Sequence, residues 1–200
     1  KIDFSLIKQK LHFIIPQYFQ TLSGWLSGSL DKLIIAPLFG FTLLGNYSLG
    51  LQVYALLTLL PAVVVKYIIP QDSSGIENKK LKLIIILSSI IIAILGFTFG
   101  PIVISTIFPK FTNAEEVIQI ISFATIPYTI TNVYHSKFYG LEKSKYVLIS
   151  STLSTGTQIL GILILGSLFG VNGIAASLVL GSSAATIFVV LEDKNIKKNN

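Results

Sequence analysis

Six long apolar stretches, separated by short polar segments, dominate the pattern of hydrophobic and polar positions along the chain. Most of them reach the roughly 20 residues that an α-helix needs to cross a hydrocarbon core. The predicted spans are Leu11–Ala36, Tyr47–Ile69, Leu83–Phe108, Val117–Tyr139, Tyr146–Phe169 and Ile174–Leu191. The last two form one uncharged run that only the turn-forming segment Phe169–Gly173 interrupts, so we predict a helical hairpin there. The pattern therefore predicts an all-α, polytopic membrane protein, with one domain built as a six-transmembrane-helix bundle.

The first span carries a polar stripe although its other faces are apolar. The stripe recurs at the helical spacings of 3 and 4 and consists of Gln17, Gln20, Gly24, Ser27 and Asp31. Such a stripe turns toward protein or water, because lipid cannot hydrate it. It is either a cavity wall that includes Asp31 and Lys32, or a face for close helix packing with those two residues paired at the membrane surface.

Two further spans repeat this pattern of polar residues at helical spacing. The stripe of the fourth span is Thr125, Tyr128, Asn132, His135 and Tyr139, and that of the fifth is Ser151, Ser154, Gln158 and Gly161. Such stripes can line a shared hydrophilic cavity, or can form hydrogen bonds between helices worth about 0.6 kcal/mol each. We favour the second interpretation for Ser and Thr, and the cavity for Asn132, His135 and Gln158.

The remaining features of the spans predict packing rather than chemistry. The third span is almost wholly apolar, so we expect it at the periphery of the bundle. The sixth span has a face of small residues, Gly173, Ser177, Gly181 and Ala184, which predicts close contact with another helix. Pro127 should kink the fourth span, because proline removes a backbone hydrogen bond.

Composition supports a membrane protein without catalytic chemistry. Hydrophobic residues make up 52% of the chain and charged residues only 12%, where a soluble domain has about 25% charged residues. The chain has no cysteine, and its two histidines, His12 and His135, lie on different spans without a metal-binding spacing. Glu115 and Glu116 are adjacent and cannot face each other across a substrate. We therefore expect neither an enzyme nor a metal site.

The lysines predict the orientation in the membrane. All 15 basic residues are lysines, and six spans place 13 of them on the side of both termini, leaving only Lys32 and Lys110 opposite. By the positive-inside rule, both ends of this segment are cytoplasmic and the chain crosses the cell membrane six times. Because the lysines are scattered among short loops, we expect no nucleic-acid partner.

Three segments resemble a known transporter family. Residues 29–64, SLDKLIIAPLFGFTLLGNYSLGLQVYALLTLLPAVV, combine an acidic and a basic residue, a short loop and a G-x-Y-S motif. Together they resemble the seventh and eighth helices of polysaccharide flippases of the multidrug/oligosaccharidyl-lipid/polysaccharide exporter superfamily. Residues 126–151, IPYTITNVYHSKFYGLEKSKYVLISS, resemble the tenth and eleventh helices, and LFGVNGIAASLVLG at 168–181 resembles the start of the twelfth.

The resemblance implies a fold and a function. The family fold has two six-helix lobes around a cavity that opens alternately to each side, and this chain corresponds to the second lobe. The first lobe would precede Lys1, which fits a chain without methionine. The family flips oligosaccharide linked to polyprenyl phosphate or diphosphate across the cell membrane for cell-surface polysaccharide biosynthesis. Lys32 and Lys66 are the basic residues placed to meet phosphates.

The residues predicted to line the cavity or contact the substrate come from four spans. They are Gln17, Gln20, Asp31, Lys32, Lys66, Tyr128, Asn132, His135 and Gln158. We expect no cofactor, and coupling to Na⁺ or H⁺ stays open. One alternative is a multidrug exporter of the same superfamily in which Asp31 couples to the cation. Another is a non-transporting membrane scaffold, in which Asp31 and Gln158 would be dispensable.

Overall fold

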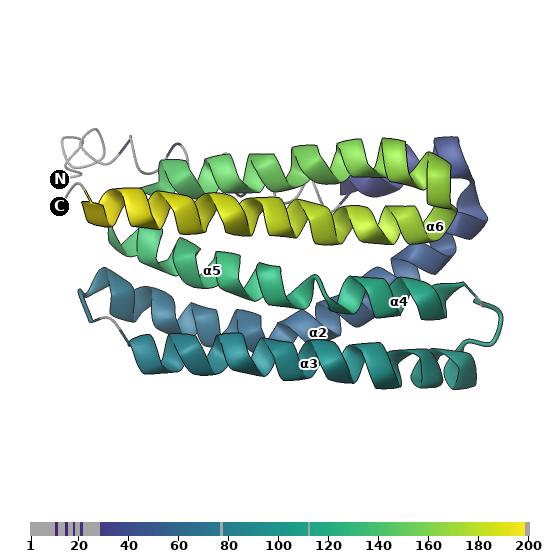
Figure 1. Ribbon diagram of the computed structural model, residues 1–200, viewed down its shortest axis with the longest axis horizontal. Helices are drawn as coiled ribbons and strands as arrows, with labels where there is room; N and C mark the ends of the chain where they lie inside the picture. Colours follow the sequence, from purple (N-terminus) through teal and green to yellow (C-terminus); the bar gives the residue numbers. More distant parts are fainter. Residues whose placement is uncertain are drawn as a thin grey trace, which may run out of the picture.

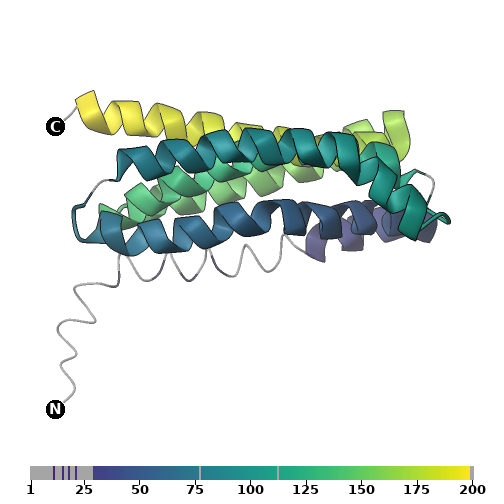
Figure 2. The same ribbon diagram turned by 90° about the horizontal axis from the view of Figure 1, so that it is seen from below.

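The computed structural model describes residues 11, 15, 18, 21, 29–76, 78–111 and 113–198, and this part contains helices and no strands. Residues 29–39 are helical, and Gly40, with a φ of 85°, ends that segment. The helices that follow are α2 (Phe41–Ser73), α3 (Lys79–Ile107), α4 (Ala114–Ser122), α5 (Thr125–Gly140) and α6 (Ser144–Lys198). Figures 1 and 2 show α2 to α6 lying side by side along one long axis. The predicted all-α membrane fold is confirmed.

Helix α6 is two helices joined by a sharp reversal, and each half is long enough to cross a membrane. Its 55 residues far exceed what one crossing needs, and Gly170 has the non-helical angles φ 60° and ψ −136°. Figure 1 shows the first half, residues 144–169, and the second half, residues 171–198, lying antiparallel. Glycine suits this position because a side chain would strain a backbone of positive φ. The reversal lies inside the segment Phe169–Gly173, where the sequence predicts a turn.

The small-residue face of the second half of α6 packs against the first half, as predicted. A Cβ atom added to Gly173 would lie 1.9 Å from the carbonyl oxygen of Leu165. One added to Gly181 would lie 2.7 Å from the carbonyl oxygen of Ser154. Only glycine allows backbones to approach so closely, so these two positions fix how the halves of α6 meet.

The fourth predicted span differs from the structure, because it consists of two helices instead of one. A turn at Phe123–Ala124 separates α4 from α5. Pro127 has no N–H to donate to the carbonyl of Phe123, and that carbonyl instead receives the N–H of Ile126 at 3.4 Å. Phe123 and Ala124 keep α-helical dihedral angles, so proline interrupts the helical hydrogen bonds where the sequence predicts a kink. The second predicted span is also too short, since α2 begins six residues before Tyr47.

Helix α3 lies at the edge of the bundle, where the sequence places it. It packs on α2, α4 and α5, while its outer face exposes large apolar side chains. Ile84, Ile91 and Ile102 are each more than half exposed. In water such a surface would be costly, whereas lipid solvates it. Helices α2, α3 and α6 are all long and apolar enough to cross a membrane.

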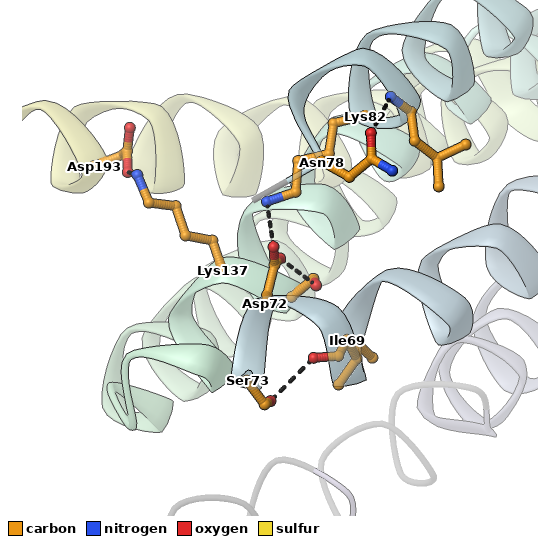
Figure 3. A network of polar contacts seen from close by, with 9 residues as sticks. Ile69, Asp72, Ser73, Asn78, Lys82, Lys137 and Asp193 are labelled. Atoms are coloured by element: carbon orange, nitrogen blue, oxygen red, sulfur yellow. Dashed lines mark hydrogen bonds and ion pairs between the residues drawn. The ribbon is translucent and has the colours of Figure 1, made fainter. Parts of the chain in front are cut away.

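A network of ion pairs ties four helices together at one end of the bundle. We call this the lysine-rich end; it holds the end of α2, the start of α3, the end of α5 and both ends of α6. Lys82 Nζ of α3 lies 2.7 Å from Asp72 Oδ1 of α2, and Ser136 of α5 donates a hydrogen bond to the other oxygen of Asp72 at 2.6 Å. Asp193 of α6 pairs with Lys137 of α5 (Figure 3).

Candidate functional site

A polar pocket lies between α5 and the two halves of α6. It has a volume of about 450 Å³. Its lining residues are Tyr128, Thr131, Asn132, His135, Ser151, Ser154, Thr155, Gln158, Ser182 and Ala185. All except the alanine are polar, and none is an acid or a lysine. The pocket can therefore offer many hydrogen bonds to a neutral, hydroxylated ligand, but no opposite charge to an anion.

Helical periodicity explains why these residues converge. Tyr128, Asn132 and His135 stand 4 and 3 residues apart on α5, so their side chains share one face. Ser151, Ser154 and Gln158 do the same on the first half of α6, which packs beside α5. Six residues of the two polar stripes predicted for the fourth and fifth spans thus line one pocket, whereas Thr125, Tyr139 and Gly161 of these stripes do not.

His135 is held at the end of this pocket by a buried hydrogen bond. Its Nε2 atom lies 2.7 Å from Ser150 Oγ, and the ring packs edge-on against Tyr139. The Ser150 hydroxyl donates to the carbonyl of Val147 at 2.9 Å. Since that hydroxyl has a single hydrogen, Nε2 of His135 acts as the donor to Ser150. The imidazole is only 8% exposed and its ring is fixed on both sides. Its role as a proton carrier stays a prediction.

A second polar feature connects the pocket to Asp31. The Gln158 side-chain amide donates a hydrogen bond to Tyr47 Oη at 3.2 Å. The Tyr47 hydroxyl in turn interacts with the Asp31 carboxylate. Asp31 and Tyr47 are both buried. We call this chain of contacts the Asp31–Tyr47–Gln158 relay; it joins the helical segment 29–39, α2 and α6.

Tyr47 is the residue of the site that the sequence analysis missed. The sequence does mark this residue, because Tyr47 is the tyrosine of the G-x-Y-S motif that follows the first predicted span. An aromatic residue in an apolar stretch is usually taken as a packing residue. Tyr47 does pack in the core, with no exposed surface, but its hydroxyl also bridges two polar side chains from different helices.

The structure brings some of the predicted site residues together and separates others. Tyr128, Asn132, His135 and Gln158 line the polar pocket, and Asp31 reaches it through Tyr47. Lys32 is exposed and contacts Asp31 through its backbone N–H at 2.8 Å. Lys66 is exposed on α2 and does not line the pocket. The predicted positions Gln17 and Gln20 lie outside the described residues.

The described residues contain no group of three or more His, Asp or Glu side chains that could hold a metal ion. Among them, Asp31 is the carboxylate of the relay; it accepts a hydrogen bond from the backbone N–H of Lys32 and interacts with the Tyr47 hydroxyl. A monovalent cation or a proton would thus meet a single buried carboxylate there.

Comparison with known proteins identifies the fold. No family model and no curated protein matches the chain. One solved structure matches with a TM-score of 0.70 and 19% sequence identity. It is described as the outward-facing conformation of a multidrug resistance MATE family transporter of the MOP superfamily. The chain folds like part of a MATE transporter. The match covers 90% of this chain but 43% of that transporter, so the chain spans less than half of its length.

Proposed function

We propose that this chain is the second lobe of a membrane transporter that flips oligosaccharide linked to a polyprenyl phosphate or diphosphate. The first lobe, from the same protein, would complete the central cavity, and the two lobes would work by alternating access. The MATE-like fold supports a transporter, and the segments that resemble polysaccharide flippases favour this substrate over others.

The polar pocket between α5 and α6 is the observation that carries the proposal. A volume of about 450 Å³ accommodates a small saccharide, and nine of ten lining residues offer hydroxyl, amide, imidazole or phenol groups. In a membrane protein such a polar surface is costly unless it meets water or a ligand. Sugar hydroxyls match these neutral groups without needing a charge. The phosphate would be met outside this pocket, by Lys32, Lys66 or residues of the first lobe.

A cation-coupled multidrug exporter is the second candidate, and a specific observation favours it. The solved structure that shares this fold is a multidrug resistance transporter. Asp31 is a buried carboxylate next to the polar pocket, which is where a coupling Na⁺ or H⁺ could exchange. In this function Asp31 would be essential, whereas a flippase driven by other means would tolerate Asp31→Asn.

Transport by the full-length protein in proteoliposomes distinguishes these functions. We expect a fluorescent polyprenyl-diphosphate oligosaccharide to change leaflets at a rate that depends on the protein. Gln158→Leu, which removes an amide from the polar pocket, should slow the movement of the oligosaccharide lipid between leaflets at least tenfold. Thr152→Val is the matched control, because Thr152 is exposed on the same helix and outside the pocket.

The alternatives make different predictions in the same assay. Efflux of a cationic dye that needs a Na⁺ or H⁺ gradient and Asp31, without movement of the oligosaccharide lipid, would replace the flippase with the drug exporter. If neither substrate moves and Gln158→Leu leaves the physiological export unchanged, the transporter proposal is wrong and the scaffold is favoured.

A further inference from the structure

A second pocket, which is basic, opens at the lysine-rich end between α3 and the second half of α6. Both helices pack on α4 and α5, while contact between α3 and α6 is at most marginal. Pockets lie between α3 and α6 at two places, and we call this strip between the two helices the slot. The pocket at the lysine-rich end has a volume of about 240 Å³. Its charged lining residues are Lys79, Lys82, Lys137, Lys197 and Asp193. We call it the α3–α6 lysine pocket.

Lysines outnumber carboxylates among the described residues that line this pocket, by four to one. Asp72 pairs with Lys82, and Asp193 pairs with both Lys137 and Lys197. Figure 3 shows Lys82 and Lys137 reaching these two carboxylates. Each ammonium group has three N–H donors, and the contact to a carboxylate uses one donor of Lys82 and one of Lys137. The pocket thus brings several ammonium groups together, which is the chemistry that recognises a phosphate.

The slot beyond the lysines is apolar. Leu83, Ile86 and Val133 line the pocket on its membrane side, and Ile90 continues the same face of α3 one turn further. Still further along, between Phe97 of α3 and Leu180 of α6, lies a second pocket of about 670 Å³ with a mainly apolar lining. From Lys82 to Phe97 the helix rises roughly 22 Å. That distance exceeds the depth of one leaflet, which is about half of a 30 Å hydrocarbon core.

We propose that the α3–α6 lysine pocket binds the phosphate headgroup of an anionic phospholipid, with an acyl chain lying in the apolar slot between α3 and α6. The lipid belongs to the leaflet at the lysine-rich end. Charge complementarity favours a lipid with a net negative headgroup over a zwitterionic one. The inference stands apart from the transported substrate, because this pocket and the polar pocket share no lining residue.

Two exposed lysines give a clean test. Lys79 and Lys197 line the pocket from α3 and α6, whereas their neighbours Lys80 and Lys198 are exposed but do not line it. The double variants Lys79→Gln/Lys197→Gln and Lys80→Gln/Lys198→Gln remove the same charge from the same two helix ends. Native mass spectrometry of the full-length protein in detergent measures binding of phosphatidylglycerol and phosphatidylcholine to each.

We expect the wild-type protein to bind phosphatidylglycerol more tightly than phosphatidylcholine. Each lysine that reaches the headgroup strengthens binding of an anionic lipid roughly fivefold, so Lys79→Gln/Lys197→Gln should weaken phosphatidylglycerol binding about 25-fold. Lys80→Gln/Lys198→Gln should stay within about twofold of wild type, and binding should weaken with salt. Inorganic phosphate without a lipid tail should bind far more weakly than phosphatidylglycerol.

Three results would overturn the proposal. Equal losses in both double variants would mean that net charge, rather than the pocket, attracts the lipid. If inorganic phosphate displaces phosphatidylglycerol at comparable concentration, the pocket binds free phosphate rather than a lipid headgroup. Tighter binding of a polyprenyl phosphate, together with loss of transport in Lys79→Gln/Lys197→Gln, would make the pocket part of the transport path. The charge-reversed variant Lys79→Glu/Lys197→Glu should change binding in the same direction with a larger effect, and an unchanged elution volume in size-exclusion chromatography shows that each variant is folded.

Discussion

The side-chain amide of Gln158 lies 3.2 Å from the hydroxyl of Tyr47, although 111 residues separate them in the chain. This contact joins the polar pocket to the buried Asp31 carboxylate, with which the same hydroxyl interacts. The phenol oxygen of Tyr47 therefore links three helical segments. A movement of α2 relative to α6 would change the environment of Asp31, which would couple this carboxylate to the polar pocket.

Tyr47→Phe tests this relay. The change removes the hydroxyl, so Gln158 loses an acceptor and Asp31 loses a polar neighbour, while the aromatic ring stays in the core. Leaving buried polar groups unsatisfied costs about 1–3 kcal/mol. We expect transport by the full-length protein to fall at least tenfold with normal membrane levels. Tyr67→Phe, at a residue that is 63% exposed on the same helix, should change nothing. Wild-type transport by Tyr47→Phe would remove the relay from the mechanism.

The ion pair of Asp72 and Lys82 should be structural. Both side chains are at most 10% exposed, so Lys82→Met leaves a buried carboxylate without its counter-charge. We expect a loss of about 3–5 kcal/mol in the free energy of unfolding, measured by denaturation in detergent. The double variant Asp72→Leu/Lys82→Met should recover most of it, because no charge remains buried. Lys80→Met, at an exposed site, serves as the control. A single variant as stable as wild type would contradict a structural role.

Gly173 and Gly156 form a matched pair on α6 for testing the hairpin. A Cβ at Gly173 would lie 1.9 Å from a backbone oxygen, whereas one at Gly156 meets nothing within 4 Å. Gly173→Ala should therefore force the halves of α6 apart and cost about 1–3 kcal/mol or more. Gly156→Ala should be neutral or slightly stabilising, since alanine favours helix. Thermal unfolding followed by size-exclusion chromatography measures both. Equal melting temperatures would mean that the halves do not pack at Gly173.

Single cysteines test the orientation that the lysines predict, because the chain has none of its own. Ser74 is exposed at the lysine-rich end, and Asn113 is exposed at the opposite end, where α4 begins. In intact cells, an impermeant thiol reagent should label Asn113→Cys and not Ser74→Cys. After the membrane is opened, both should react. Labelling of Ser74→Cys from outside would reverse the proposed orientation.

The sequence predicted what depends on periodicity along one helix. The polar faces of α5 and of the first half of α6 follow from the spacing of Asn132, His135 and Gln158, and the reversal follows from Gly170 and its neighbours. Boundaries were less accurate. The turn before α5 arises because Pro127 has no N–H to donate to the carbonyl of Phe123. Helix α2 extends past both predicted ends because polar residues such as Asn46 and Gln71 are compatible with a helix there.

Contacts between helices could not be predicted, because spacing gives the face of a helix but not its neighbour. Asp31 and Lys32 looked like a pair since they are adjacent, yet the carboxylate interacts with Tyr47 on another helix. Lys82 appeared only as one of the lysines scattered among short loops. The arrangement of α3, α5 and α6 places it around one pocket with Lys137 and Asp193.

Several polar groups that line the polar pocket already donate hydrogen bonds within the protein. Ser182 and Thr155 donate their hydroxyl hydrogens to carbonyls one turn back, and Asn132 spends a donor on the carbonyl of Tyr128 at 2.8 Å. What these groups present to a ligand is mainly lone pairs. The hydroxyl groups of a saccharide can donate hydrogen bonds to these lone pairs, whereas a phosphate diester has no donor. In a flippase of lipid-linked sugar, the glycan would therefore bind in this pocket and the phosphate would be held elsewhere in the protein.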